Sequence, residues 1–504
     1  MEKVAIVELN ANELKLHFVD VVRNKSYVVY NTTTMPINLF KDYSDEDNFI
    51  KPAVIKDILE ILSVFKNMIN EEQVVETLCY ATSKISEAKN LNGFINEMFN
   101  ASGLKFTVMT PEEEINYIYT SVINTFNKPK GIIINVSNFN TEILIYNRRN
   151  ILNTLVLPIG DISATNKYAS ESKEEFYAKI TKEVSSVLEE TEWLKEPYEE
   201  FELIGVGSVF KNIGILSRKA SKYPLDMAHN YNMSMDSFKK VYSVISGQEI
   251  TGSKIKGLPV SDSKSFQGGI AIVDAILNFF NKPSVSISNF NQIEGLLFNY
   301  AIHLTLEKPI MDVLGYSLQV INDYYNEKRA KCTDKVYNIS MILYRQLKVL
   351  HKLTNKMYQR VLRIASYMSN SGYRVDLANA DKAAFNLILS SNIYGVNQNE
   401  ILLAAFVVMA KNADNFNLKE WVRYSELLTE EDLKAVQKLS VILRLAEALN
   451  ITGFGAVDDI SCDILGDSVI IKTIVNRDAQ FEINYAKQIN TDFKKAFNKH
   501  ADIL

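Results

Sequence analysis

Cysteine, histidine, glycine and proline are all scarce in this chain of 504 residues. The three cysteines, Cys79, Cys332 and Cys462, stand far apart, which argues against a disulfide framework and against a cysteine-based zinc site. The five histidines are scattered too, and leave little for a histidine metal cage. The 19 glycines and 10 prolines fall well below the usual ~7% and ~5%, so the composition favours long helices and leaves few glycines for phosphate-binding loops.

Long apolar runs and charge of one sign are also missing. The longest purely apolar run, residues 401–410, is far shorter than the roughly 20 residues that a membrane span needs. Lys plus Arg number 55 against 60 Asp plus Glu, with no polybasic tail, so we expect no nucleic-acid partner and no membrane partner. The first residues do not have the pattern of a signal peptide. The sequence therefore predicts a cytoplasmic protein.

The composition that remains is that of a globular protein, with 47% hydrophobic and 23% charged residues, and the length predicts three or four domains. Residues 4–9 and 14–22 alternate around a short polar turn, which predicts a β-hairpin. Apolar residues at helical spacing predict a helix over 52–70, and a β-rich run predicts a strand over 74–80.

A second helix is predicted over 111–126. Thr110 is its expected N-cap, and Glu112, Glu113 and Glu114 fall in its first turn, where negative charge is favourable. From the residues alone, each of these glutamates serves equally well to stabilise the start of the helix.

The strand–turn–strand pattern then starts again over 131–136 and 141–146. In this repeat Asn135 stands at the place of Glu8, 127 residues later. A hairpin followed by alternating helices and strands, present twice, predicts two α/β lobes that face a cleft, over residues 1–125 and 126–300.

The remainder of the chain has a different pattern of apolar residues. Helical spacing dominates from about residue 291, and predicts a helical domain over 301–453. A small α+β domain over 454–504 follows, with a hairpin over 460–475, a strand over 480–485 and a last helix.

Several segments match, in order, the motifs of one known family. Its opening Asp-Ile-Gly-Ser-Asn-Ser turn is similar to Glu-Leu-Asn-Ala-Asn-Glu at 8–13, and its Asp-Ile-Gly-Gly-Gly-Ser-Thr-Glu loop to Asn-Val-Ser-Asn-Phe-Asn-Thr-Glu at 135–142. Further matches are Ala-Thr-Ser at 81–83, Thr-Pro-Glu-Glu-Glu-Ile at 110–115, Leu-Pro-Ile-Gly at 157–160 and Gly-Val-Gly-Ser at 205–208. Over nearly its whole length the chain resembles the exopolyphosphatase and guanosine-pentaphosphate phosphohydrolase (Ppx/GppA) family.

The resemblance implies an α/β fold of two actin-like (ribonuclease H-like, ASKHA) lobes, followed by an all-α HD-like domain and a small α+β tail. It also implies Mg²⁺-assisted hydrolysis of terminal phosphoanhydride bonds in inorganic polyphosphate or pppGpp. By position, Glu114 is the general base, and Glu8 and, more weakly, Asn135 hold the metal. The positions that the resemblance assigns to phosphate binding are Asn12, Ser137, Asn138, Asn140, Thr141, Gly207 and Ser208.

The motifs are eroded at positions where this chemistry needs particular residues. Ser137, Asn138 and Phe139 replace three glycines that let a backbone approach phosphate closely. Asn10 replaces another glycine, and because asparagine tolerates positive φ, Asn10 and Asn138 are the least damaging replacements. Ser86 stands where the family has an arginine that clamps phosphate.

The helical domain is altered in the same way. The family's His-Asp pair falls on Ser369 and Asn370, and residues 376–384 contain no histidine where the family has a histidine-rich turn. The family's Tyr-His-Arg segment is Met-Ala-Lys at 409–411. We therefore expect no metal-dependent reaction in this domain.

Two functions remain open from the sequence. The first is a hydrolase with weakened activity, and the second is a catalytically dead relative that binds polyphosphate, a guanosine alarmone or a protein partner. The loop chemistry favours the second function, whereas the family assignment favours the first. An actin-like ATPase or sugar kinase is less well supported, because the loops carry no nucleotide signature. Family members commonly dimerise through the helical half, so a homodimer is a further expectation.

Overall fold

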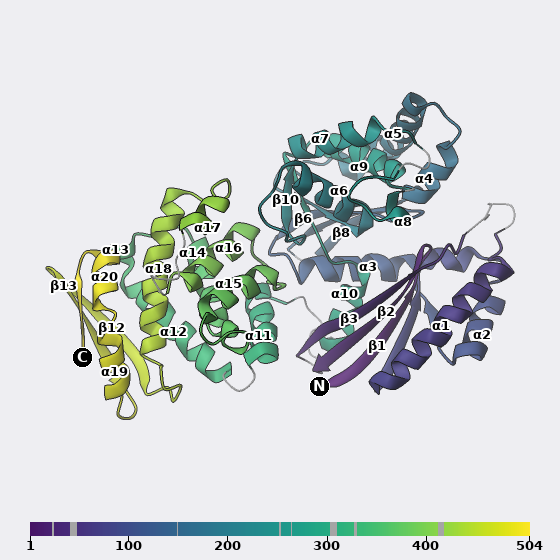
Figure 1. Ribbon diagram of the computed structural model, residues 1–504. Coiled ribbons are helices and arrows are strands. Elements are labelled where there is room, and N and C mark those ends of the chain that lie inside the picture. The colour runs from purple at the N-terminus through teal and green to yellow at the C-terminus, as the bar shows by residue number, and fades with distance from the viewer. Residues whose placement is uncertain are drawn as a thin grey trace. The chain divides into compact units, whose positions relative to one another are not determined.

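The computed structural model divides into two compact units, Met1–Met311 and Asp312–Leu504 (Figure 1). It describes the whole chain except residues 23–24, 41–47, 149, 251–253, 264, 303–309, 327–329 and 412–417. The four domains expected from the sequence form a finer division than these two units, and that division stays a prediction.

The first lobe of unit 1 is built on a five-stranded sheet in the order β3-β2-β1-β4-β5. The central strand β1 runs antiparallel to β2 and parallel to β4, so the predicted hairpin is confirmed. Residues 4–9 of β1 are all buried, as in a strand covered on both faces. The strands are β1 (Glu2–Leu9), β2 (Glu13–Val22), β3 (Ser26–Pro36), β4 (Glu76–Ala81) and β5 (Phe106–Val108). The helices are α1 (Pro52–Glu72), η1 (Ser83–Glu87), α2 (Leu91–Ser102) and α3 (Pro111–Ile123).

The second lobe repeats this topology. Its sheet has the order β10-β11-β9-β6-β7-β8, in which β8-β7-β6-β9-β11 reproduces the order β3-β2-β1-β4-β5. The duplication expected from the sequence is therefore confirmed. The strands are β6 (Lys130–Val136), β7 (Thr141–Asn147), β8 (Asn150–Leu157), β9 (Glu202–Val206), β10 (Tyr231–Ser234) and β11 (Ser284–Ile287). The helices are α4 (Asp161–Tyr168), α5 (Lys173–Glu190), η2 (Glu192–Lys195), α6 (Gly207–Ala220), α7 (Met235–Ser246), α8 (Val260–Ser263) and α9 (Phe266–Phe280).

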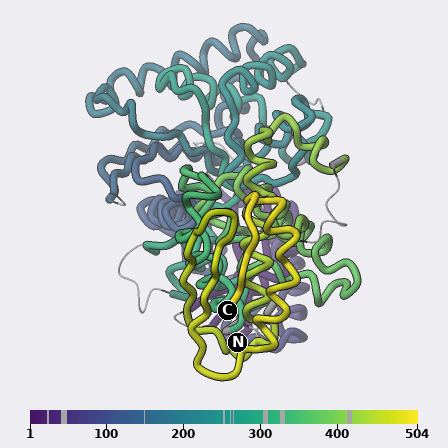
Figure 2. Tube along the Cα trace, turned by 90° about the vertical axis from the view of Figure 1, so that its left-hand side faces the viewer, coloured from purple at the N-terminus to yellow at the C-terminus, as the bar shows by residue number. Residues whose placement is uncertain are grey.

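Unit 2 consists of packed helices and a C-terminal three-stranded sheet in the order β12-β13-β14, traced in yellow in Figure 2. Its helices are α11 (Val313–Asn326), α12 (Ala330–Gln346), α13 (Lys348–His351), α14 (Met357–Met368), η4 (Ser371–Arg374), α15 (Ala380–Ser390), α16 (Gln398–Met409), α17 (Leu418–Arg423), α18 (Glu430–Ala448), α19 (Gln480–Lys487) and α20 (Asn490–Phe497). Its strands are β12 (Val457–Leu465), β13 (Ser468–Val475) and β14 (His500–Ile503).

The strand predicted over 480–485 is wrong, because these residues form the helix α19. Phe481 and Tyr485 suggested strand alternation, but they lie one helical turn apart, and their rings stack on the exposed face of the helix. The buried face is formed instead by Ala479, Glu482 and Ala486, at a spacing of three and four residues. A period of two and a period of 3.6 cannot be told apart over so short a segment.

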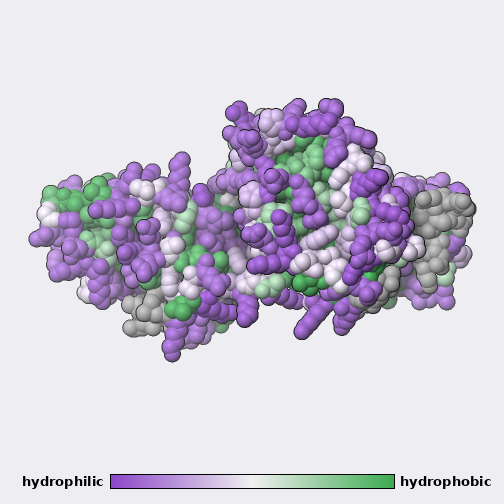
Figure 3. Space-filling model, turned by 90° about the horizontal axis from the view of Figure 1, so that it is seen from above, coloured by the Kyte–Doolittle hydropathy of each residue, from purple (hydrophilic) through white to green (hydrophobic). Residues whose placement is uncertain are grey.

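Hydrophilic side chains cover most of the face shown in Figure 3, with apolar groups between them. Among the helices of the described residues, none is both long and apolar enough to cross a lipid bilayer.

Helix α10 (Gln292–Ile302) follows the last strand of the second lobe, yet it packs on α3 of the first lobe. The two helices are in backbone contact at Gly295, where a Cβ atom would lie 1.8 Å from the carbonyl oxygen of Tyr117. The same helix contacts β3, because the Tyr27 ring meets the Phe298 ring edge to face at 5.3 Å. α10 therefore joins the two lobes.

This crossing leads to a prediction on stability. Gly295→Ala should lower the free energy of unfolding by about 1–3 kcal/mol, because its Cβ meets rigid backbone and the helices must move apart. Gly93→Ala on α2 is the matched control: nothing lies within 4 Å of its Cβ, so better helix propensity should stabilise the protein by up to about 1 kcal/mol. Urea unfolding of both variants measures the difference. Equal stability of the two variants would refute the close-contact account.

Candidate active site

Glu8 and Asn135 occupy equivalent places in the two lobes. Glu8 is the last residue but one of β1, and Asn135 is the last residue but one of β6, its counterpart in the second sheet. Both side chains are buried. Glu114 interacts electrostatically with Glu8 and with Glu142, and Glu142 is hydrogen-bonded to Asn135. We call these four residues the candidate site.

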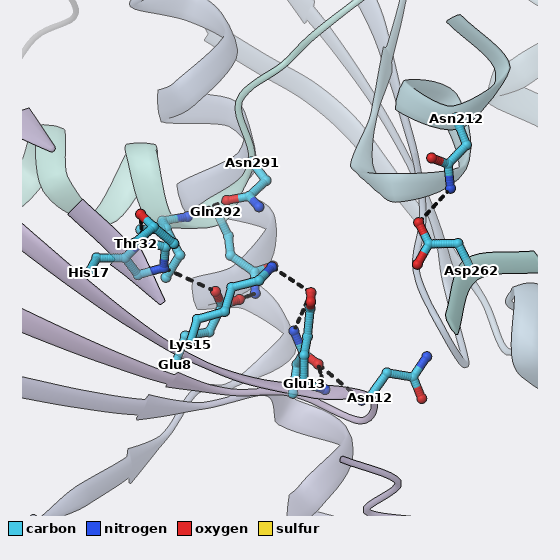
Figure 4. Close-up of polar contacts among 12 residues, drawn as sticks. Glu8, Asn12, Glu13, Lys15, His17, Thr32, Asn212, Asp262, Asn291 and Gln292 are labelled. Carbon is cyan, nitrogen blue, oxygen red and sulfur yellow. Dashed lines mark hydrogen bonds and ion pairs between the residues drawn. The ribbon is translucent and has the colours of Figure 1, made fainter. Parts of the chain in front are cut away.

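Glu8 lies in a polar network of the first lobe (Figure 4). Its Oε1 accepts a hydrogen bond of 3.2 Å from Gln292 Nε2, and its Oε2 lies 3.7 Å from His17 Nε2, too far for a hydrogen bond. Burial alone would raise the pKa of Glu8. The positive charge of Lys15 and the contacts with His17 and Gln292 outweigh this effect and hold the pKa below its usual value. Glu8 is therefore a buried, ionised carboxylate.

The environment of Glu8 suits a hard cation. Its Oε2 is buried and has no hydrogen-bond partner, so one carboxylate oxygen is left for another ligand. Within the described residues, no group of three or more His, Cys, Asp or Glu side chains is arranged to hold a metal ion. Mg²⁺ needs fewer protein ligands than that, because it is usually held by one or two carboxylates together with water and substrate phosphates. The residues present therefore fit Mg²⁺.

The first loop, between β1 and β2, is closed by the side chain of Asn10. Its Oδ1 accepts hydrogen bonds from the backbone N–H groups of Asn12 (3.0 Å) and Glu13 (2.9 Å). Neither Asn10 nor Asn138 has a positive φ, so neither position uses the tolerance of asparagine for that conformation. Asn10 acts through its side chain instead, and occupies two donors that a phosphate would use. The Asn12 side chain extends beyond this turn, away from Glu8 (Figure 4).

The second loop, between β6 and β7, rests on the N-terminus of α4. The carbonyl oxygen of Ser137 accepts from Asp161 N–H at 3.0 Å, and that of Asn138 accepts from the N–H groups of Ile162 and Ser163. Gly160 permits this approach, because a Cβ there would lie 2.3 Å from the Ser137 carbonyl oxygen.

The backbone amides at the tip of this loop take no part in these hydrogen bonds. The backbone N–H groups of Asn138, Phe139 and Asn140 donate to no residue that the structure describes. They are available to an anion, as a phosphate-binding loop requires. The hydroxyl of Thr141 is not, because it is buried and donates to the carbonyl oxygen of Ile159 at 2.7 Å.

Phe139 contacts the first lobe. Its ring meets the ring of Phe40 edge to face, with centroids 4.9 Å apart, and the ammonium of Lys84 lies 5.2 Å from the Phe139 centroid. Edge-to-face and cation–π contacts of this kind are each worth roughly 0.5–1.5 kcal/mol. Phe139 therefore links the second loop to the first lobe.

Glu114 is distinguished from its neighbours by its partners. Glu113 forms the capping box with Thr110, whereas Glu114 accepts two hydrogen bonds from Ser83: 2.9 Å from its N–H and 2.6 Å from its hydroxyl. Burial raises the pKa of Glu114, the Ser83 hydrogen bonds oppose this, and the charges of Glu8 and Glu113 raise it further. Its carboxylate is thus held in a fixed orientation by Ser83, within electrostatic reach of Glu8.

Glu142 is a residue of the site that the sequence analysis did not assign. It pairs with Asn135 across the β6–β7 hairpin, and Asn135 Nδ2 donates to its Oε2 at 2.8 Å. Burial raises the pKa of Glu142 to about 8, with a further contribution from Glu114 and an opposing one from the Asn135 hydrogen bond. Writing out the hairpin register would have found this pair, since Asn135 and Glu142 stand directly opposite each other.

The turn from β9 into α6 also reaches the site. Gly207 begins α6 with φ +88°, and a Cβ there would lie 2.5 Å from Asn135 Oδ1. Only glycine satisfies both the backbone conformation and the close approach. The start of α6 therefore lies beside Asn135, with Ser208 exposed next to it, and the N-terminus of a helix is favourable for an anion.

Comparisons with known proteins agree with this architecture. A curated relative, the bifunctional 3-dehydroquinate synthase/phosphatase of Fusobacterium nucleatum, is 21% identical over 314 residues, which span 58% of this chain and 46% of that protein. The chain thus covers less than half of that relative's length.

Two solved structures share the fold of this chain. A Ppx/GppA family member of Aquifex aeolicus has a TM-score of 0.52 and 19% identity, and covers 60% of this chain and 99% of its own. An exopolyphosphatase of Cytophaga hutchinsonii has a TM-score of 0.54 and 16% identity, and covers 59% of this chain and 97% of its own.

Family models match both units. The model of the Ppx/GppA phosphatase family matches residues 22–303, and that of Ppx/GppA phosphatase domain III matches residues 325–488. The first match alone spans more than half of the chain. The protein belongs to the Ppx/GppA phosphatase family.

Proposed function

We propose that this chain hydrolyses terminal phosphoanhydride bonds of inorganic polyphosphate or pppGpp, at a lower rate than intact family motifs would give. The observation that carries the proposal is the fixation of Glu114 by two hydrogen bonds from Ser83, in a place where it interacts electrostatically with Glu8 and Glu142. A general base needs a fixed carboxylate that can accept a proton from water. Glu114 meets this requirement. The phosphatase named in the Fusobacterium nucleatum relative supports the same reaction class.

The residues in and around the candidate site have separate roles in the proposed reaction. Glu114 orients the attacking water and takes its proton. The free N–H groups of Asn138, Phe139 and Asn140 and the start of α6 receive phosphate oxygens. Lys15 places a positive charge beside Glu8. The chemistry that a bound Mg²⁺ would supply is neutralisation of phosphate charge, with Glu8 and, more weakly, Asn135 as its protein ligands.

Three features support a low rate. Asn10 occupies two backbone donors of the first loop, Phe139 places a ring on the second loop, and Asn135 is a neutral ligand where a carboxylate binds Mg²⁺ better. Loss of one preorganised donor at a reacting phosphate or acyl group typically costs two or three orders of magnitude in rate. The combination is compatible with slow turnover.

The contact of Phe139 with Phe40 and Lys84 favours a second candidate function. If this contact persists when ligand is bound, phosphate cannot reach the loop closely enough to react. The chain would then bind polyphosphate, a guanosine alarmone or a protein partner without turnover. A homodimer through the helical unit stays a prediction in either case.

The two candidates are separated by the Glu114→Gln variant. We expect phosphate release from polyphosphate and from pppGpp, measured with and without Mg²⁺, to fall about 10²- to 10⁴-fold, because glutamine keeps the shape but cannot take the proton. Glu113→Gln is the matched control in the same helical turn. Glutamine is accepted in a capping box, so this variant should keep the wild-type rate. Turnover that is indifferent to Glu114→Gln would overturn the assignment of the base.

Restoring glycine at the loop tests the role of the aromatic contact. Phe139→Gly should raise the rate of phosphate release roughly tenfold, because the backbone can then approach the phosphate closely, and Asn135→Asp with Ser86→Arg should raise it further. Phe40→Ala removes the same ring contact without changing the loop backbone, and should have a smaller effect. If Phe139→Gly tightens binding of polyphosphate but releases no phosphate, the second candidate is correct.

A further inference from the structure

Unit 2 contains a buried ammonium group, that of Lys411, whose side chain is only 7% exposed. Lys411 follows the C-terminus of α16. Its Nζ donates to Glu447 Oε1 on α18 at 2.9 Å and lies 3.3 Å from Asp381 Oδ1 on α15. It also donates, at 3.4 Å, to the carbonyl oxygen of Ser369 at the end of α14. Oxygens from three helical segments thus surround one cation.

The charge on Lys411 is maintained by these neighbours. Burial alone would lower the pKa of Lys411, but the charges of Glu447 and Asp381 outweigh burial and raise it above the usual lysine value. The end of α14 adds to this, because the C-terminus of a helix carries partial negative charge. A buried ammonium is tolerated only when it is paired in this way.

The ammonium of Lys411 in turn stabilises the two carboxylates that surround it. Asp381 and Glu447 come from different helices, and their side chains are only 16% and 18% exposed. Without a cation between them, two carboxylates would face each other with little water to screen them. The α15 end is itself packed closely on η4, since a Cβ at Gly372 would be 1.9 Å from the carbonyl oxygen of Ala380.

This arrangement differs from an ordinary ion pair. Two carboxylates and one backbone carbonyl converge on a single point, and these are the ligand types that hard cations select. We propose that Asp381, Glu447 and the carbonyl of Ser369 form a cation site that the ammonium of Lys411 fills permanently. Unit 2 is thereby held together by an internal cation, and a divalent ion takes this place only when the lysine is removed.

The test uses Lys411→Ala in the full-length chain. Removing one partner of a buried ion pair is strongly destabilising, so we expect its melting temperature to fall by roughly 10 °C. Hydrogen exchange should accelerate in peptides that cover residues 401–411 and 440–449. Millimolar Mg²⁺ or Mn²⁺ should restore roughly half of the lost melting temperature and slow exchange in the same peptides, because either ion binds the folded state of the variant.

Lys335→Ala is the matched control. The Lys335 ammonium also lies 3.3 Å from a carboxylate, that of Asp458, but this pair is more exposed and should contribute little. Any response to Mg²⁺ that arises in the candidate active site will be shared by this control and by the wild type. Only the response beyond that level, in the peptides around residue 411, counts as filling of the Lys411 site.

A second variant covers the case in which Lys411→Ala does not fold. The triple variant Lys411→Met, Asp381→Asn and Glu447→Gln removes the cation together with both negative charges. It should fold, be more stable than Lys411→Ala and show no extra response to Mg²⁺ or Mn²⁺. The proposal is overturned if Lys411→Ala keeps wild-type stability, if neither ion affects it beyond the control, or if the triple variant is no more stable than the single one.

Discussion

The packing of α10 against α3 is the constraint on which the candidate active site depends. The two helices touch at Gly295 without an intervening side chain, and each carries part of the site. α3 presents Glu114 in its first turn, and α10 presents Gln292, which donates to Glu8. Since α10 follows the last strand of the second lobe, this contact ties the end of the second lobe to the first.

Within this frame, the two loops that end β1 and β6 use their backbone donors differently. Asn10 closes the first loop with its carboxamide, and so makes hydrogen bonds that would otherwise be offered to a ligand. The second loop contacts α4 through backbone carbonyls, and the amides of 138–140 have no partner among the residues that the structure describes. The two loops have therefore diverged in different ways. The first has used its donors internally, whereas the second keeps its donors and places the ring of Phe139 among them.

The sequence was sufficient for whatever depends on local pattern. The duplicated hairpin, the cap at Thr110 and the place of Glu114 follow from alternation, helix-start signals and motif order, and the structure contains all three. Contacts between distant segments could not be foreseen. Phe40 lies almost a hundred residues before Phe139, and no local pattern relates them. Likewise, the pattern of residues 480–485 fits a strand and a helix equally, and only the burial of Ala479, Glu482 and Ala486 decides between them.

Lys15 and Lys411 show that the same electrostatic arrangement can serve different ends. For both lysines burial lowers the pKa, and nearby carboxylates, Glu8 and Glu13 for Lys15 and Glu447 and Asp381 for Lys411, reverse the effect and raise it. The two lysines differ in how far solvent reaches their side chains. The Lys15 side chain is 20% exposed beside a loop, whereas the Lys411 side chain is 7% exposed and surrounded by helix ends. Two buried lysines among carboxylates therefore share one electrostatic arrangement and differ in solvent access, and only the more exposed one leaves room for a further group beside it.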